Sequence, residues 1–167
     1  VHREGPTLRH HLQVMLNALS HPENFSDILP MYYQEILSKN REFFIWFILL
    51  HDIGKLRTQK DKPDGSISNP GHELKSIEIM DEFNLAAGFP SRDTLKKIIQ
   101  SHMNIFVEGG IKSGNEYDFK GFLNKNNLSP KEFEFLICAV FIDMAWRHDA
   151  NEVFEKVHKW GTELAKK

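Results

Sequence analysis

The pair His51-Asp52 stands at the end of the most apolar stretch of the chain, FFIWFILL, which runs from Phe43 to Leu50. A segment this hydrophobic is expected to be buried, where an ionised carboxylate is costly unless it is paired or binds a metal. An imidazole and a carboxylate side by side are suitable metal ligands. A structural alternative also fits: a helix that ends at Gly54, with His51 bonded to a backbone carbonyl and Asp52 capping the next turn.

Four further side chains that can bind a metal lie within or at the ends of apolar helical patterns, where a polar residue needs a partner: His10, His72, His102 and Asp143. Taken singly, each histidine has a simpler explanation as a surface residue, a residue near a helix start or a hydrogen-bonded core residue. Asp143 is harder to explain, because an acid inside ICAVFIDM is costly without a cation nearby.

Two basic residues share a helical spacing with the two candidate acids. Lys55 follows Asp52 by three residues and Arg147 follows Asp143 by four, so each pair is expected on one helix face. The lysine suits a phosphoryl group as a point charge, and the arginine can bind phosphate through two hydrogen bonds. The alternatives are a solvated lysine and a salt bridge from Arg147 that positions Asp143.

The elements that would hold these residues are helical. Apolar residues recur with helical spacing, and SPKE from Ser129 to Glu132 is a capping box with proline at the first helical position. The pattern predicts helices over about 8–19, 25–37, 43–51, 72–83, 91–103, 117–123, 130–144 and 151–165, with loops over 58–71 and 106–115. Pro30 is expected in the first turn of the second helix. We therefore predict an all-α bundle of seven or eight helices, as a single domain over residues 1–167.

Composition narrows the possible partners. A length of 167 residues suits one domain, and a net charge of −2 argues against an extended nucleic-acid surface. The single cysteine, Cys138, lies in an apolar run and is expected to be an inert buried thiol. No signal-peptide core and no run long enough to span a bilayer is found, so we expect a cytoplasmic protein without a membrane partner.

The order of the candidate ligands resembles the signature of the HD superfamily of metal-dependent phosphohydrolases: a histidine, then His-Asp, then two histidines and an aspartate, each from a separate helix. The resemblance runs from Leu8 to about Arg147, and its most specific piece is FILLHDIGK. His10 fits the family's register before LQV, whereas His11 is displaced by one residue.

Two later segments indicate a branch of the family. The tripeptide GHE at His72 resembles the HD domains of bacterial tRNA nucleotidyltransferases, and IQSH contains the next histidine, His102. DMAWR, from Asp143 to Arg147, resembles the closing acid with an arginine four residues later. The GYP tripeptide of the cyclic-di-GMP phosphodiesterases is missing, since MNIF follows His102.

The resemblance implies a divalent transition metal held by His10, His51, Asp52 and Asp143. Where a second ion binds, Asp52 would bridge the two ions, while His72 and His102 would hold the second. With one ion, these two histidines would instead grip phosphate or protonate the leaving oxygen. Imidazole with carboxylate suits manganese, iron, cobalt, nickel or zinc better than magnesium.

The resulting hypothesis is a phosphomonoesterase or phosphodiesterase that acts on a nucleotide or an RNA-end phosphate through a metal-activated water. Asp52 and Lys55 would be catalytic, and Lys55 and Arg147 would bind substrate. RNA end-healing proteins also carry HD domains, and any fused or partner domain would lie outside this chain. The alternatives are a non-catalytic HD module that binds a nucleotide or RNA as a sensor, and a metal-free helical bundle.

Overall fold

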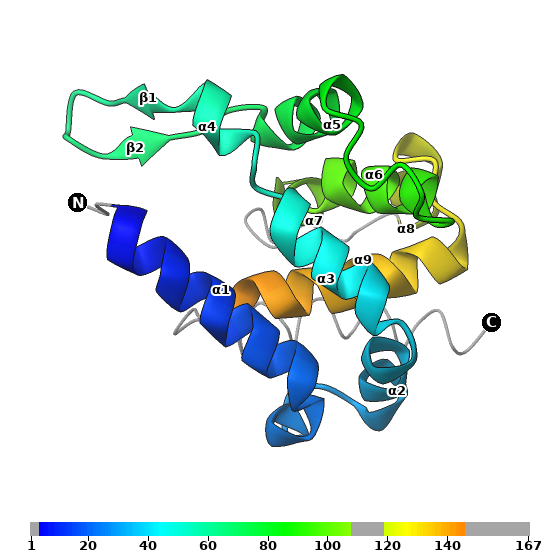
Figure 1. Ribbon diagram of the computed structural model, residues 1–167. Coiled ribbons are helices and arrows are strands. Elements are labelled where there is room, and N and C mark those ends of the chain that lie inside the picture. The colour runs from blue at the N-terminus through cyan, green and yellow to red at the C-terminus, as the bar shows by residue number, and fades with distance from the viewer. Residues whose placement is uncertain (1–3, 108–118, 146–167) are drawn as a thin grey trace.

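The structure of the protein is a computed structural model that describes the backbone of residues 4–107 and 119–145, and the side chains of residues 10–105 and 121–145. The described chain is helical except for one two-stranded hairpin (Figure 1). Seven of the described α-helices have seven residues or more, which confirms the predicted all-α class. None of the described helices is both long and apolar enough to span a membrane.

The elements follow one another in this order: α1 (Glu4–Ser20), the 3-10 helix η1 (Pro22–Phe25), α2 (Met31–Lys39), α3 (Arg41–Leu50), α4 (Lys55–Thr58), β1 (Lys60–Asp61), β2 (Ile67–Ser68), α5 (His72–Glu82), α6 (Arg92–Ser101), α7 (Asn104–Val107), α8 (Phe119–Lys125) and α9 (Pro130–Met144).

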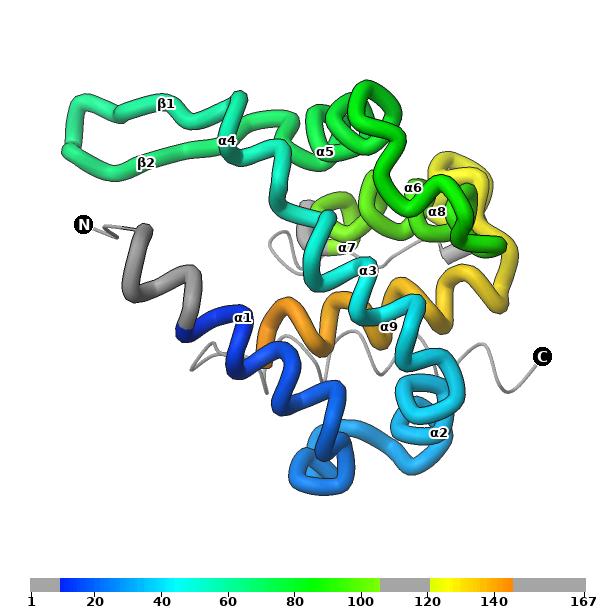
Figure 2. The backbone as a smooth tube through the Cα atoms, in the orientation of Figure 1, coloured from blue at the N-terminus to red at the C-terminus, as the bar shows by residue number. Residues whose placement is uncertain are grey.

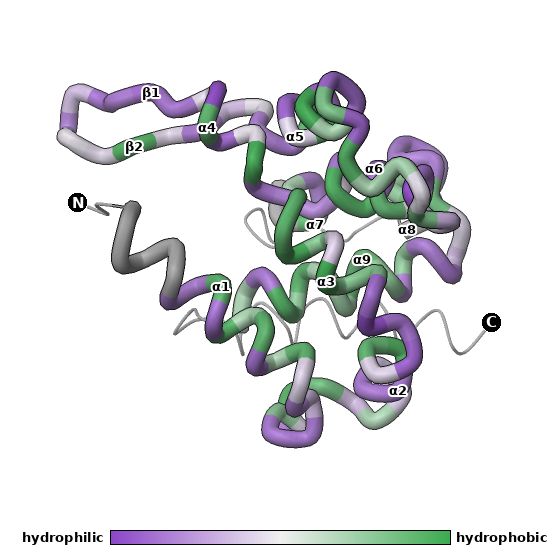
Figure 3. Tube along the Cα trace, in the orientation of Figure 1, coloured by the Kyte–Doolittle hydropathy of each residue, from purple (hydrophilic) through white to green (hydrophobic). Residues whose placement is uncertain are grey.

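Helices α3 and α9 form the centre of the bundle. Each of the two contacts α1, α2 and α6 as well as the other, and both are mostly apolar along their length (Figure 3). Phe44 and Phe47 of α3 and Phe133 of α9 are completely buried, and each such side chain contributes roughly 1.5–3 kcal/mol by leaving water. Cys138 is also buried in α9, and burial raises the pKa of its thiol, as expected for an inert residue.

Two predictions about local structure were wrong. The helix expected over 25–37 begins only at Met31, because Pro30 has extended backbone angles (φ −53°, ψ 148°) and lies before the first turn. The expected loop over 58–71 contains the antiparallel hairpin, in which Lys60 lies opposite Ser68. The hairpin projects from the helical body (Figure 2).

The hairpin closes on Lys62-Pro-Asp-Gly65. The amide of Gly65 donates to the carbonyl of Lys62 (2.9 Å), and Gly65 has a left-handed φ of 76°. Proline at the second position of a turn followed by a left-handed glycine is typical of a short hairpin connection. The loop predicted over 106–115 and the helix predicted over 151–165 fall largely or wholly outside the described residues.

The predicted capping box at the start of α9 is confirmed. The Ser129 hydroxyl accepts from the amide of Glu132 (3.2 Å), and the Glu132 carboxylate accepts from the amide of Ser129 (2.8 Å). The box fixes the start of the helix that carries Asp143.

Replacing Ser129 with alanine is expected to lower the free energy of unfolding by about 1 kcal/mol, because the amide of Glu132 loses its acceptor. Urea unfolding followed by circular dichroism measures the change. Ser38→Ala is the matched control: this exposed serine only donates to the carbonyl of Gln34 within α2, so its removal should change stability by less than about 0.5 kcal/mol. Equal losses in the two variants would contradict a capping role.

Candidate metal centre

The candidate site begins where α3 ends. His51 is the C-cap of α3, and residues 51–54 form a turn into the short helix α4. The His51 ring is buried and donates from Nδ1 to the carbonyl of Phe47 (3.0 Å). Its Nε2 lies 3.3 Å from Asp143 Oδ1 and 3.4 Å from Asp52 Oδ2. The apolar run thus ends with an imidazole held between two carboxylates.

His72 and His102 are oriented in the same way. His72 Nδ1 donates to the carbonyl of Asn69 (2.8 Å), and His102 Nδ1 donates to the carbonyl of Ile99 (2.6 Å). A carbonyl oxygen only accepts, so Nδ1 must carry the ring proton in both histidines. Each Nε2 is then left to bind a metal, and metal-binding histidines are commonly oriented by such a bond.

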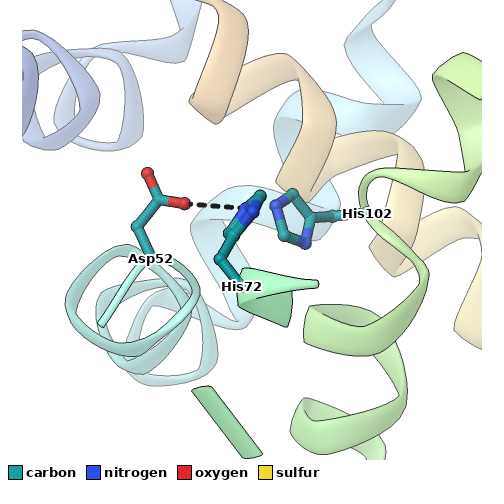
Figure 4. A group of neighbouring side chains, drawn as sticks. All are labelled: Asp52, His72 and His102. Carbon is teal, nitrogen blue, oxygen red and sulfur yellow. Dashed lines mark ion pairs between the residues drawn. The ribbon is translucent and has the colours of Figure 1, made fainter. Parts of the chain in front are cut away.

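Asp52 is shared by two groups of candidate ligands. Its Oδ1 lies 3.2 Å from His72 Nε2, and its Oδ2 faces His51 and accepts from Lys55 Nζ at 2.5 Å. Ligand atoms within 4.8 Å of one another form two sets: Asp52, His72 and His102, and His51, Asp52 and Asp143. Figure 4 shows the first set, with Asp52 directed at His72 and the His102 ring beyond it.

The metal-binding atoms of these side chains fit a divalent cation. His72 Nε2 is buried and makes no hydrogen bond with any described residue, although Asp52 Oδ1 lies 3.2 Å away. With Nδ1 carrying the ring proton, the imidazole lone pair and the carboxylate oxygen face each other as two acceptors. Such a pair is stable only with a cation or a further proton between them. Imidazole nitrogen with carboxylate oxygen is the ligand chemistry of the transition metals.

The charges of the site give His51 and His102 different pKa values. Burial opposes protonation of His51, but the charge of Asp52 and the hydrogen bond with Asp143 raise its pKa to about 9. Burial and the nearby charge of His51 lower the pKa of His102 to about 4, so this ring is neutral at pH 7.

The two carboxylates remain ionised. Burial opposes ionisation of both carboxyl groups. The charge of His51 and the close approach of His72 nevertheless hold the pKa of Asp52 below its usual value, and the hydrogen bond with His51 and the charge of its ring do the same for Asp143. Lys55 adds to this effect on Asp52.

The family model described as HD domain matches residues 7–139. The chain belongs to the HD domain family. No curated protein and no solved structure matched. HD domains are typically metal-dependent phosphohydrolases, and the histidine and aspartate groups of this HD domain are consistent with a metal site.

The structure brings together five of the six side chains predicted as ligands in this HD domain, namely His51, Asp52, His72, His102 and Asp143. The sixth, His10, is exposed on α1 and belongs to neither group; its ring lies 6.3 Å from that of His11. Its role as a ligand stays a prediction. Lys55 contacts Asp52, as its spacing indicated, and Arg147 lies outside the described residues.

Sequence reasoning missed the role of Gly54, which was read only as a helix end. The backbone of Gly54 lies directly on the first turns of α5: a Cβ atom there would be 2.0 Å from the His72 carbonyl oxygen and 2.6 Å from the Ser76 amide nitrogen. A glycine two residues after Asp52 was the available signal, because glycine permits close backbone approach.

Gly54→Ala is expected to lower the free energy of unfolding by about 1–3 kcal/mol, since the turn and α5 must move apart to admit a methyl group. The same movement separates Asp52 from His72, so binding of Mn²⁺ should weaken as well. Urea unfolding and equilibrium dialysis measure the two effects.

Gly88→Ala is the control, because nothing lies within 4 Å of the Cβ position there. It should change stability by less than about 0.5 kcal/mol. Wild-type metal binding in Gly54→Ala would show that this close contact does not position the ligands.

Metal binding is expected to release one proton from His51 near pH 7. In the metal-free protein its pKa of about 9 keeps the ring protonated, whereas a ligand must offer a free Nε2. Apparent affinity should therefore fall about tenfold for each pH unit below 9. Titration calorimetry in buffers of different ionisation enthalpy counts the protons; a heat that is independent of the buffer would contradict this expectation.

Proposed function

We propose that this HD domain is a phosphomonoesterase or phosphodiesterase that hydrolyses a nucleotide or RNA-end phosphate with a metal-activated water. The observation that carries the proposal is the Asp52 carboxylate, one oxygen of which faces His72 while the other faces His51. A carboxylate between two sets of ligands suits a pair of ions, which can clamp a phosphate.

The residues that would hold the ions divide by set. His51, Asp52 and Asp143 would bind the first ion, with His10 as the fourth ligand predicted from the sequence. Asp52, His72 and His102 would bind the second. A bound manganese, iron, cobalt, nickel or zinc ion would supply a Lewis acid for a phosphoryl oxygen and lower the pKa of a water.

Lys55 is the cationic group best placed to act on the substrate. Its ammonium contacts Asp52 Oδ2 at 2.5 Å, and its side chain is partly exposed at the edge of the site. From this position it can stabilise negative charge that develops on a transferred phosphoryl group. Arg147, which was predicted to bind substrate from its spacing to Asp143, would bind the phosphate through two hydrogen bonds.

The substrate class rests on sequence likeness. GHE at His72 and the arginine four residues after Asp143 favour the tRNA-processing and RNA end-healing branches. A protein with a net charge of −2 is not expected to have an extended basic surface for nucleic acid. Substrates that present one terminal or 2′,3′-cyclic phosphate therefore suit this site.

A non-catalytic HD module that binds a nucleotide or RNA as a sensor is the second candidate. The exposed position of His10 favours it, since the first set then has three protein ligands. An open coordination position is, however, also what a catalytic metal requires.

The test is hydrolysis of p-nitrophenyl phosphate and bis-p-nitrophenyl phosphate by metal-stripped protein with added Mn²⁺, Co²⁺ or Ni²⁺. Asp52→Asn should lower turnover at least about a hundredfold, because it removes the shared ligand charge. Asp27→Asn, an exposed residue before α2, should leave turnover unchanged. Oligonucleotides with 3′-phosphate or 2′,3′-cyclic ends then identify the substrate.

Two outcomes would overturn the proposal. Tight nucleotide binding with no turnover on any metal would favour the sensor. No bound transition metal after reconstitution would favour the metal-free bundle.

A further inference from the structure

The break between α3 and α4 leaves backbone groups that neither helix satisfies. Around the turn, the amide of Ile53 bonds to the Leu50 carbonyl (3.4 Å) and the amide of Lys55 bonds to the Asp52 carbonyl (3.0 Å). The carbonyl of His51 and the amide of Gly54 have no backbone partner among the described residues. Helix ends leave such groups, and when they are buried they need a side-chain partner.

One hydroxyl satisfies both groups. Ser76 Oγ donates to the carbonyl of His51 (2.8 Å) and accepts from the amide of Gly54 (2.9 Å). Ser76 is completely buried in α5. A serine hydroxyl has one proton and two lone pairs, so it can serve the donor and the acceptor at once.

The two bonds join the segments that carry Asp52 and His72. Ser76 follows His72 by four residues, so both side chains lie on the face of α5 that meets the turn. The turn can approach that face because Gly54 has no side chain to strike it. Asp52 lies between His51 and Gly54, the two residues that Ser76 binds.

We propose that Ser76 is a positioning residue that fixes Asp52 against His72. The inference rests on the proposed metal-binding function. It concerns the set Asp52, His72 and His102, because of the two sets only this one has a ligand, His72, on α5, the helix that the two bonds hold against the turn. Loss of the hydroxyl leaves two buried backbone groups without a partner, and they can reach water only if the turn moves away from α5.

The test compares Ser76→Ala with Thr58→Ala. Thr58 Oγ1 donates to the carbonyl of Gly54 (3.2 Å) from within α4 and makes no hydrogen bond to α5 among the described residues, so its hydroxyl bonds to the same turn without linking the turn to α5. Amide hydrogen exchange of the metal-free protein, followed by NMR, measures how well the Gly54 amide is protected by its bond to Ser76. In Ser76→Ala, exchange at Gly54 should rise at least about tenfold relative to amides within α3, and in Thr58→Ala it should not.

Equilibrium dialysis against Mn²⁺ with elemental analysis measures how tightly each of the two ions binds. Ser76→Ala should weaken binding of the second ion at least about tenfold and keep the first, whereas Thr58→Ala should bind both as wild type does. Ser76→Cys keeps the side-chain size with a weakly bonding thiol, and it takes the place of the alanine variant if that variant does not fold.

Unchanged exchange at Gly54, or equal weakening of both ions, would overturn the positioning role. A wild-type protein that binds no transition metal would instead overturn the proposed function, and the exchange experiment would still report whether Ser76 holds the turn. The two failures are therefore distinguishable.

Discussion

An imidazole nitrogen and a carboxylate oxygen face each other across 3.2 Å in the site, the first from His72 and the second from Asp52. The carboxylate oxygen is a hydrogen-bond acceptor. The Nε2 atom of His72 is also an acceptor, because Nδ1 of the same ring donates to a carbonyl, and it is shielded from water. Bringing two such atoms together costs free energy, which the rest of the fold must supply through burial and backbone hydrogen bonding. The arrangement is therefore evidence for a positively charged occupant, whether proton or metal.

The apolar helices supply that free energy. Phe44 and Phe47 anchor α3 in the bundle core, and the Phe47 ring stacks on His51 with centroids 4.7 Å apart. Each histidine of the site is bonded to a carbonyl three or four residues earlier, so the backbone orients all three rings. The acceptor carbonyls of Phe47 and Ile99 lie in the last turns of α3 and α6, and the carbonyl of Asn69 lies in the segment just before α5.

Much of this could be predicted from the residues. The apolar run before His51 indicated a buried helix, the acid within ICAVFIDM indicated a partner for Asp143, and SPKE fixed the start of α9. The rest depends on tertiary contacts that leave no local pattern. Nothing in the spacing says that Gly54 touches the backbone of α5, that Ser76 binds the turn, or which carbonyl each imidazole meets. Pro30 was predicted inside the first turn of a helix but lies before it, because local spacing does not distinguish these two positions for a proline.

The hairpin has an architectural consequence. It leaves the bundle after Thr58 and returns at His72, and these two points are held by the contact of α4 with α5. Its strands provide none of the five clustered ligands. Lengthening an exposed loop whose ends are already fixed costs only a slowly growing closure entropy. The tip at Gly65, which has open space around it, is thus a position where extra sequence, even a small inserted module, can be accommodated while the ligand geometry is kept.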